Sequence, residues 1–325
     1  MVLRSRYILF FVVVCLGSLQ SFGQTDHLPA KVRAQLDTHQ DSLTHFAYDI
    51  VNAPEAEQRF RADSFFIRML VRTLKIPNSF YYTFDSLQTI SKLYAPDSSF
   101  RIFTWQIKKD VYVFLQRGAI QMRTEDGSLK LFPLHDVSMF TKKPGDSVRG
   151  ANNWIGAIYY RIIQKTVNGK KVYTLLGFDD FTINSNKKWM DVLTFDGQGQ
   201  PVFGGPYFSF KNDSAKASKN QTVRFYIEYK KEASTSFNYD STLDMVIYDH
   251  LISETDEPNR KETYVPDGDY EGFVWQNGQW LHVTKVFNTS LQDNQFPVDK
   301  KILNDAGGID EDALRAQSDK NRKKK

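Results

Sequence analysis

The fold class is decided by residues 152–208, which read NNWIGAIYYRIIQKTVNGKKVYTLLGFDDFTINSNKKWMDVLTFDGQGQPVFGGPYF. Turn signals at Asn168-Gly169 and Asp196-Gly197 separate runs rich in β-branched and aromatic residues. Such runs, joined by short turns, favour an antiparallel sheet. Residues 154–164 are apolar on both alternating faces, so we expect this strand to be covered on both sides.

The flanking segments predict helices before this sheet and further strands on both sides of it. Apolar residues recur at helical spacing over residues 31–50, and a second helix starts after Asn52 and runs to about Lys75. A short helix is also expected over residues 85–93. Alternating strands begin at Phe100 and return after a polar loop from Val223 onward. The sequence therefore predicts an α+β protein, mainly β, in which a helical hairpin (24–98) precedes a large antiparallel domain (99–287), built as a curved sheet or a sandwich.

The N-terminus is typical of an export signal. Arg4 and Arg6 precede an apolar run over residues 7–16, which is short for a bilayer span, and small residues favour cleavage after Gly23. We expect residues 1–23 to be removed and the protein to reach the periplasm or the outer membrane. A retained membrane anchor and lipidation of Cys15 are the alternatives. Cys15 is the only cysteine, so the processed chain should lack disulfides and thiol chemistry.

The C-terminal residues 288–325 lose apolar periodicity and end in KNRKKK. Such a segment buries too little surface to offset the entropy of ordering, so a disordered basic tail is expected. This tail could attach the protein to an acidic surface through weak, salt-sensitive contacts. The formal net charge of +4 is too small for this length to favour nucleic-acid binding.

Five segments form a distinctive combination: NWIGAIYY at 153–160, YTLLGF at 173–178, DVLTF at 191–195, PVFG at 201–204 and MVIYDHL at 245–251. Together they resemble a group of uncharacterised secreted proteins from Bacteroidota-type bacteria. The resemblance extends from about the second helix to Phe287. It implies export and an envelope location, but it implies no activity and no site residue.

Three side chains are weak candidates for acid–base catalysis. Asp191 is expected on a buried face of a central strand, where an unpaired carboxylate would be costly. His250 ends a later strand and could form an acid–base pair with Glu228 or Asp191 if the fold brings them together. A structural, hydrogen-bonded role is the simpler interpretation for Asp191 and His250. The chain contains no G-x-S-x-G, H-E-x-x-H or phosphate-binding glycine loop.

Four other side chains are candidates for ligand binding. Arg224 and Tyr226 lie on one face of the alternating strand 223–229 and could form a binding surface, although a solvated sheet face has the same pattern. Trp275 and Trp280 flank the Asn277-Gly278 turn and could stack on a sugar, although most tryptophans of a sheet protein lie in the core.

The sequence suggests no cofactor and no metal site. The acidic pairs Asp179-Asp180 and Asp267-Gly268-Asp269 are more typical of turns than of a calcium loop. The leading hypothesis is therefore a non-enzymatic envelope protein that binds a partner protein or helps assembly. The alternative is a carbohydrate-binding module or a glycan hydrolase of the envelope.

Overall fold

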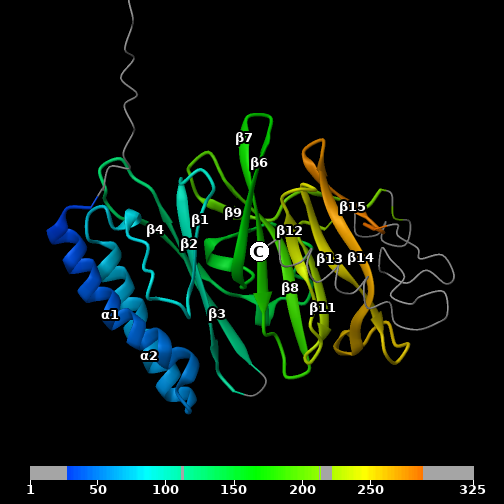
Figure 1. Cartoon of the computed structure of the whole chain (residues 1–325), viewed down its shortest axis with the longest axis horizontal. Helices are drawn as coiled ribbons and strands as arrows, with labels where there is room; N and C mark the ends of the chain where they lie inside the picture. Colours follow the sequence, from blue (N-terminus) through cyan, green and yellow to red (C-terminus); the bar gives the residue numbers. More distant parts are fainter. Residues whose placement is uncertain (1–27, 111–112, 212, 214–221, 288–325) are drawn as a thin grey trace, which may run out of the picture.

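In the described part of the chain, two α-helices and three sheets follow one another along the molecule (Figure 1). The computed structural model describes residues 28–110, 113–211, 213 and 222–287. The predicted signal peptide and the predicted basic tail lie outside the described residues. The predicted fold class is confirmed: a helical hairpin precedes three mostly antiparallel sheets, and the protein is mainly β.

The helices α1 (Ala30–Asn52) and α2 (Ala56–Leu74) form the predicted hairpin. A capping box between Glu55 and Gln58 satisfies backbone N–H groups at the start of α2. Phe66 of α2 is completely buried and packs edge-on against Trp105, with 5.1 Å between ring centroids. The hairpin is thus fixed to the first sheet by an apolar core.

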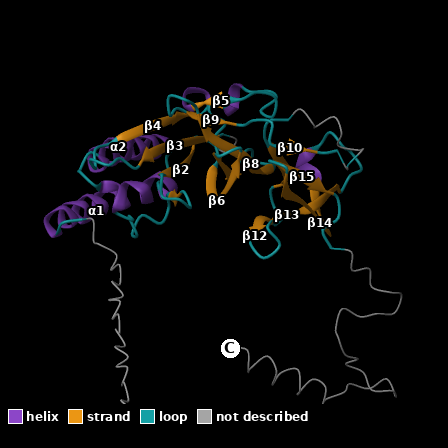
Figure 2. Cartoon of the chain, turned by 90° about the horizontal axis from the view of Figure 1, so that it is seen from above, coloured by secondary structure: helices purple, strands orange, loops and turns teal. Residues whose placement is uncertain are grey.

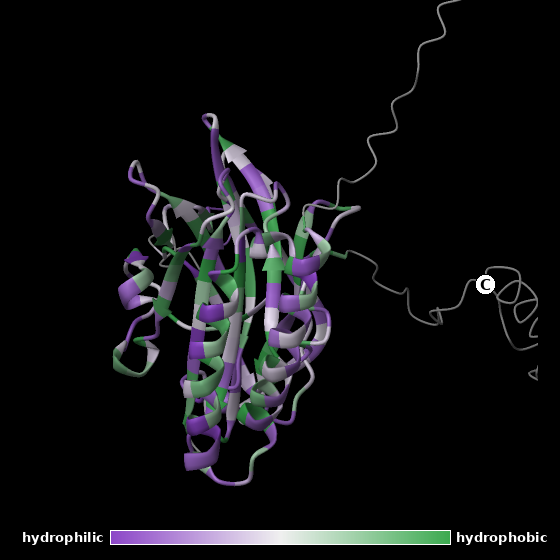
Figure 3. Ribbon diagram, turned by 90° about the vertical axis from the view of Figure 1, so that its left-hand side faces the viewer, coloured by the Kyte–Doolittle hydropathy of each residue, from purple (hydrophilic) through white to green (hydrophobic). Residues whose placement is uncertain are grey.

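The outer surface of the hairpin mixes apolar and polar residues, as the view onto the helices shows (Figure 3). Tyr48, Val51 and Phe65 are among the exposed apolar side chains. In the described part of the chain, neither helix has the length and apolarity needed to cross a membrane.

The first sheet packs between the helices and the second sheet, and its strand order is β1-β2-β3-β4. These strands are β1 (Ser91–Tyr94), β2 (Phe100–Lys108), β3 (Phe114–Met122) and β4 (Lys130–His135). The helix expected over residues 85–93 is wrong. Residues 91–94 pair with β2 instead, and Leu87 and Ile90 enter the core, so tertiary pairing outweighs the local helical pattern.

The second sheet contains the stretch that predicted the fold. Its strand order is β5-β9-β8-β7-β6, and a sixth strand, β11, pairs with β8. Asn168 and Gly169 have positive φ values of 49° and 75° at the β6–β7 turn, as the hairpin prediction requires. The strands are β5 (Arg149–Gly150), β6 (Ile158–Val167), β7 (Lys170–Asp179), β8 (Ser185–Phe195), β9 (Pro201–Phe203) and β11 (Phe225–Lys230).

The prediction that residues 154–164 form a strand covered on both sides is wrong for β6, in which Tyr160 and Arg161 are exposed; the strand covered on both faces is β8. Trp189 and Leu193 of β8 belong to a core shared with the first sheet, whereas Met190 and Val192 belong to a core shared with the third sheet. The predicted first strand is shorter than expected. Trp154 is buried, but it follows a 3₁₀ turn, and β6 begins only at Ile158.

The third sheet has the order β10-β15-β14-β13-β12. Four of its strands pair antiparallel, whereas β10 pairs parallel with β15 through Phe208 and Trp280. It lies at the opposite end of the molecule from the helices (Figure 2). Its strands are β10 (Phe208–Ser209), β12 (Phe237–Asp240), β13 (Met245–Ser253), β14 (Tyr264–Gln276) and β15 (Gln279–Val283).

Candidate functional site

A cleft of about 600 Å³ opens where the second and third sheets meet. Residues 224–228 at the start of β11 line one side, and residues 248–251 of β13 line another. The loop 142–146, together with Lys261 and Tyr264, completes the walls, and Glu271 of β14 reaches the cleft. Four of the predicted site residues, which are far apart in the sequence, line this one cleft: Arg224, Tyr226, Glu228 and His250.

All residues from 224 to 228 line the cleft, so both faces of β11 border it. Phe225 and Ile227 are buried in the core shared with the third sheet, so Tyr226 and Glu228 point to the other face. Tyr226 lies 4.7 Å from Trp189, ring centroid to ring centroid. Glu228 accepts a hydrogen bond of 2.7 Å from Ser185 Oγ and lies 3.6 Å from Lys187 Nζ. Both side chains are therefore held in place from β8.

Two residues that line the cleft, Tyr248 and Glu271, contact two buried polar side chains behind them, and the four are named here the floor cluster: Asp213, Tyr248, Glu271 and His282. The Tyr248 hydroxyl donates to Glu271 Oε2 at 2.7 Å and lies 2.8 Å from His282 Nε2. The Asp213 carboxylate lies 3.2 Å from His282 Nδ1. None of the four is more than 7% exposed, and Tyr248 links Glu271 to His282, whereas His282 Nδ1 is buried beside Asp213 without a hydrogen bond of good geometry.

His250 connects the floor cluster to the mouth of the cleft. Its Nε2 lies 4.0 Å from Glu271 Oε1, and its Nδ1 lies 2.8 Å from Asp267 Oδ2. The β13–β14 pairing shifts register between Asp249 and Leu251, at the position of His250. Bulges of this kind re-aim a side chain. A continuous series of titratable groups therefore leads from the buried Asp213 to the half-exposed His250.

The electrostatics of the site keep Tyr248 a hydrogen-bond donor. Burial, and next the neighbouring Glu271 carboxylate, raise the pKa of Tyr248 well above its ordinary value. Burial opposes ionisation of Asp267, but hydrogen bonds from the Asp269 N–H and from His250 outweigh it and lower the pKa of Asp267. In the Glu271–His250 contact, the Tyr248 phenol therefore bonds Glu271, and the ionised Asp267 carboxylate lies next to His250.

Asp191 does not join this series and instead pairs with Arg224. The register Phe225↔Met190 places Arg224 across from Asp191, and Arg224 Nε donates to Asp191 Oδ2 at 3.2 Å. Arg224 also donates to the carbonyl oxygens of Pro144, Ser147 and Phe203. Asp191 accepts a further bond of 2.8 Å from the Val192 N–H. Both side chains are buried, which fits the structural interpretation of Asp191.

The two tryptophans predicted to stack on a sugar lie away from the cleft. Trp280 is completely buried and donates from Nε1 to Thr174 Oγ1 at 2.8 Å. Trp275 is half-buried, and its ring meets that of Trp280 edge-on at 5.1 Å. Trp280 therefore belongs to the core, and only Trp275 has ring surface open to solvent.

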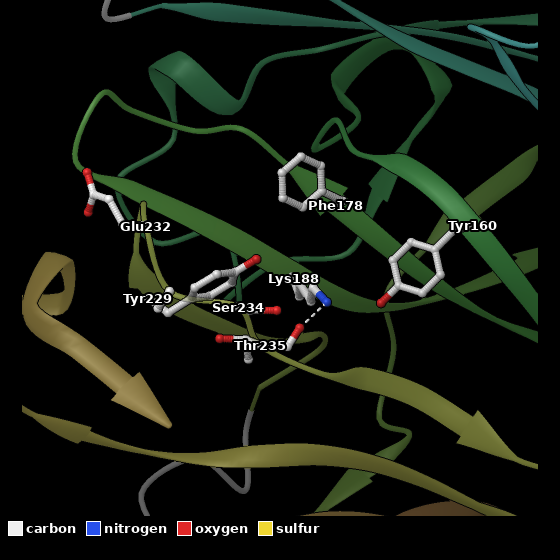
Figure 4. A pocket seen from close by; sticks show the side chains of 8 residues that line it. Tyr160, Phe178, Lys188, Tyr229, Glu232, Ser234 and Thr235 are labelled. Atoms are coloured by element: carbon white, nitrogen blue, oxygen red, sulfur yellow. Dashed lines mark hydrogen bonds between the residues drawn. The ribbon is translucent and has the colours of Figure 1, made fainter. Parts of the chain in front are cut away.

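A second hollow of about 480 Å³ lies among Tyr160, Lys188 and Tyr229 (Figure 4). The Lys188 side chain extends toward Thr235 and donates to its carbonyl oxygen, and the Tyr160 hydroxyl donates to Phe237 O at 2.6 Å. These polar groups tie β6 and β8 to the segment before β12. The Lys188 ammonium and the Tyr160 hydroxyl already bond within the protein, so the hollow offers a ligand fewer available polar groups than the cleft does.

Sequence reasoning missed all four members of the floor cluster. One signal was present: His282 occupies an inward position of the alternating strand 279–283, where a polar side chain needs a partner. Its partners come from three other segments, at positions 213, 248 and 271, and no local spacing connects them.

Within the described ranges, no group of three or more His, Cys, Asp or Glu side chains is arranged to hold a metal ion. No family model and no curated protein matches this sequence.

Proposed function

We propose that this chain is an exported protein of the cell envelope whose cleft binds a glycan and hydrolyses it. The observation that carries the proposal is the series of titratable groups from Asp213 through Glu271 to His250; a second carboxylate, Glu228, borders the same cleft from the opposite face of β11. Most enzymes that hydrolyse glycosides use two carboxyl groups near the glycosidic bond that is broken. Export rests on the predicted signal peptide and on the resemblance to secreted envelope proteins.

The lining of the cleft suits a polyhydroxylated ligand. Tyr226 and Tyr264 are half-buried, so each offers ring surface together with a hydroxyl group. Lys142, Asp146 and Lys261 add charged groups of both signs around the opening. Aromatic surface combined with several hydrogen-bonding groups is typical of a site that orients a polar small molecule.

In the proposed reaction, Glu271 acts as the acid and Glu228 as the base. Glu271 donates a proton to the glycosidic oxygen as the bond from the anomeric carbon to that oxygen breaks. Glu228 accepts a proton from a water molecule, whose oxygen forms the new bond to the anomeric carbon. Tyr248 and His282 hold the Glu271 carboxyl group in position and provide a path by which its proton is replaced.

Glu271→Gln is expected to reduce turnover by about 10²–10⁴-fold while glycan binding is retained, because the amide keeps the shape but cannot transfer the proton. Turnover is measured as reducing ends released from purified peptidoglycan and envelope polysaccharides, and binding by calorimetry on the same glycans. Tyr226→Ala is expected to weaken binding.

The matched control is Glu254→Gln, which changes an exposed carboxylate paired with Lys230. Turnover by Glu271→Gln at the rate of the unmodified protein would refute the catalytic role. Binding that survives both Tyr226→Ala and Tyr264→Ala would refute the glycan site.

A protein partner is the second candidate, and the free edge of β11 favours it. Among the described strands β11 pairs only with β8, and Lys231 N–H bonds toward β8 at Asn184 O. Alternation then directs the backbone groups of Tyr226 and Glu228 away from β8, toward the cleft. An extended segment of a partner can add to such an edge as a further strand.

Glu228→Pro separates this candidate from the first, because proline removes the N–H that an added strand needs. Glu228→Ala is the matched control, since it removes the same carboxylate and keeps the N–H. A partner recovered from native envelope by the alanine variant and lost by the proline variant supports strand addition. Equal recovery by both variants counts against it.

A further inference from the structure

An apolar tip projects from the protein beside the cleft. It is the 3₁₀ turn Ser138–Phe140, in which Met139 is 53% exposed and Phe140 is 85% exposed. Phe140 has the largest exposure among the large apolar residues recorded for the described chain. A phenylalanine left in water forgoes the favourable free energy of its burial, so an exposed apolar tip often marks a contact surface.

Hydrogen bonds within the turn and to residues 154–156 hold the tip in a fixed conformation. Asp136 accepts hydrogen bonds from the N–H of Ser138 at 2.9 Å and from the N–H of Gly156 at 3.0 Å. The Val137 N–H donates to Trp154 O at 2.9 Å, and the Thr141 hydroxyl donates to Val137 O at 2.9 Å. The protein therefore orders this turn and still leaves Phe140 outside, so the exposure is built into the fold.

Two lysines follow the tip directly. Lys142 and Lys143 are exposed. The next two residues are held by hydrogen bonds: Arg224 donates to Pro144 O, and the Val223 N–H donates to Gly145 O at 2.8 Å. Val148 adds a further apolar side chain, 48% exposed, whereas Asp146 is the one acid within residues 138–148. The loop therefore combines a convex apolar tip with a net positive flank.

We propose that the loop 138–148 docks on an anionic lipid surface, with Met139 and Phe140 entering the interface and Lys142 and Lys143 meeting the headgroups. A convex tip flanked by cations suits a soft, negatively charged interface, whereas a protein partner for one protruding ring would have to offer a pocket. Because residues 142–146 also line the cleft, docking holds the cleft close to the membrane surface. This goes beyond the proposed reaction, and it does not depend on it.

The test measures co-sedimentation of the full chain with vesicles of phosphatidylcholine alone and of phosphatidylcholine mixed with phosphatidylglycerol. Binding is expected on the anionic vesicles and is expected to weaken as salt is raised. Phe140→Ser should weaken it roughly tenfold. Lys142→Glu combined with Lys143→Glu should remove the preference for anionic vesicles.

Leu243→Ser is the matched control, because Leu243 is also an exposed apolar residue, 48% exposed, in a turn far along the chain. Each variant is also prepared without residues 320–325, so that attraction by the basic C-terminal end is measured separately. Equal binding by Phe140→Ser and Leu243→Ser would overturn the proposal. Loss of a captured protein in Phe140→Ser, without vesicle binding by the unmodified chain, would overturn the lipid assignment.

Discussion

Arg224→Met is expected to lower the free energy of unfolding by about 3–5 kcal/mol, the range found when one partner of a buried ion pair is removed. The change leaves the Asp191 carboxylate without its cation in a site that is 2% exposed. It also removes the donors to Pro144, Ser147 and Phe203. Denaturant unfolding of both proteins measures the difference.

The double variant Asp191→Leu with Arg224→Met is the control. It removes both charges together, so no buried carboxylate is left unpaired, and it should be more stable than Arg224→Met alone. A double variant as unstable as the sum of its single variants would show that the two side chains are not coupled. That result would contradict the structural pairing of Asp191 described above.

Asp179→Asn is expected to flatten the pH dependence of stability between about pH 4 and pH 7. Burial raises the pKa of Asp179 to about 7; Lys187 opposes this shift and Asp136 adds to it. The folded state then holds a proton that the unfolded state releases near pH 4, so stability is lost as pH rises through this window. A shift of this size corresponds to at most about 4 kcal/mol.

Unfolding by denaturant at several pH values checks this prediction. Other groups titrate in both proteins, so the difference between the two curves isolates Asp179. We expect the unmodified chain to lose more stability than the variant from about pH 4 to pH 7. Parallel curves would show that Asp179 is ionised throughout the range.

Asparagine is a suitable replacement because it can keep the local hydrogen bond. Gln116 Nε2 donates to Asp179 Oδ1 at 2.8 Å, a contact that the asparagine can keep through its carbonyl oxygen.

The sequence predicted the architecture because the decisive signals are local. Each of these signals depends only on residues close together in the sequence. They are the Asn168-Gly169 turn, the alternation of residues 223–229 and the helical spacing of residues 31–50. The helix expected at 85–93 failed for the opposite reason. Residues 91–94 are decided by pairing with β2, which no local pattern reveals.

The candidate site was predictable only in part. The alternation of β11 identified Tyr226 and Glu228 as one face, and His250 was identified as the end of a strand, although β13 continues to Ser253 and His250 lies at a shift in its pairing register. The sequence could not show that these residues share a cleft, because that depends on how two sheets pack. Glu271 was missed for the same reason, and His282 offered only its inward position as a signal: neither has its partners nearby in the sequence, and only the fold brings them within hydrogen-bonding distance.

The parallel pairing of β10 with β15 has a consequence for biosynthesis. Phe208 pairs with Trp280, which lies 72 positions later in the sequence, so this contact forms only after nearly all of the described chain has been synthesised. Closing so long a loop is slow compared with forming hairpins such as β6–β7. The floor cluster depends on the same strand, since His282 lies in β15. A nascent chain that stops before residue 279 can complete the helices and the first sheet, yet it lacks the histidine of the floor cluster.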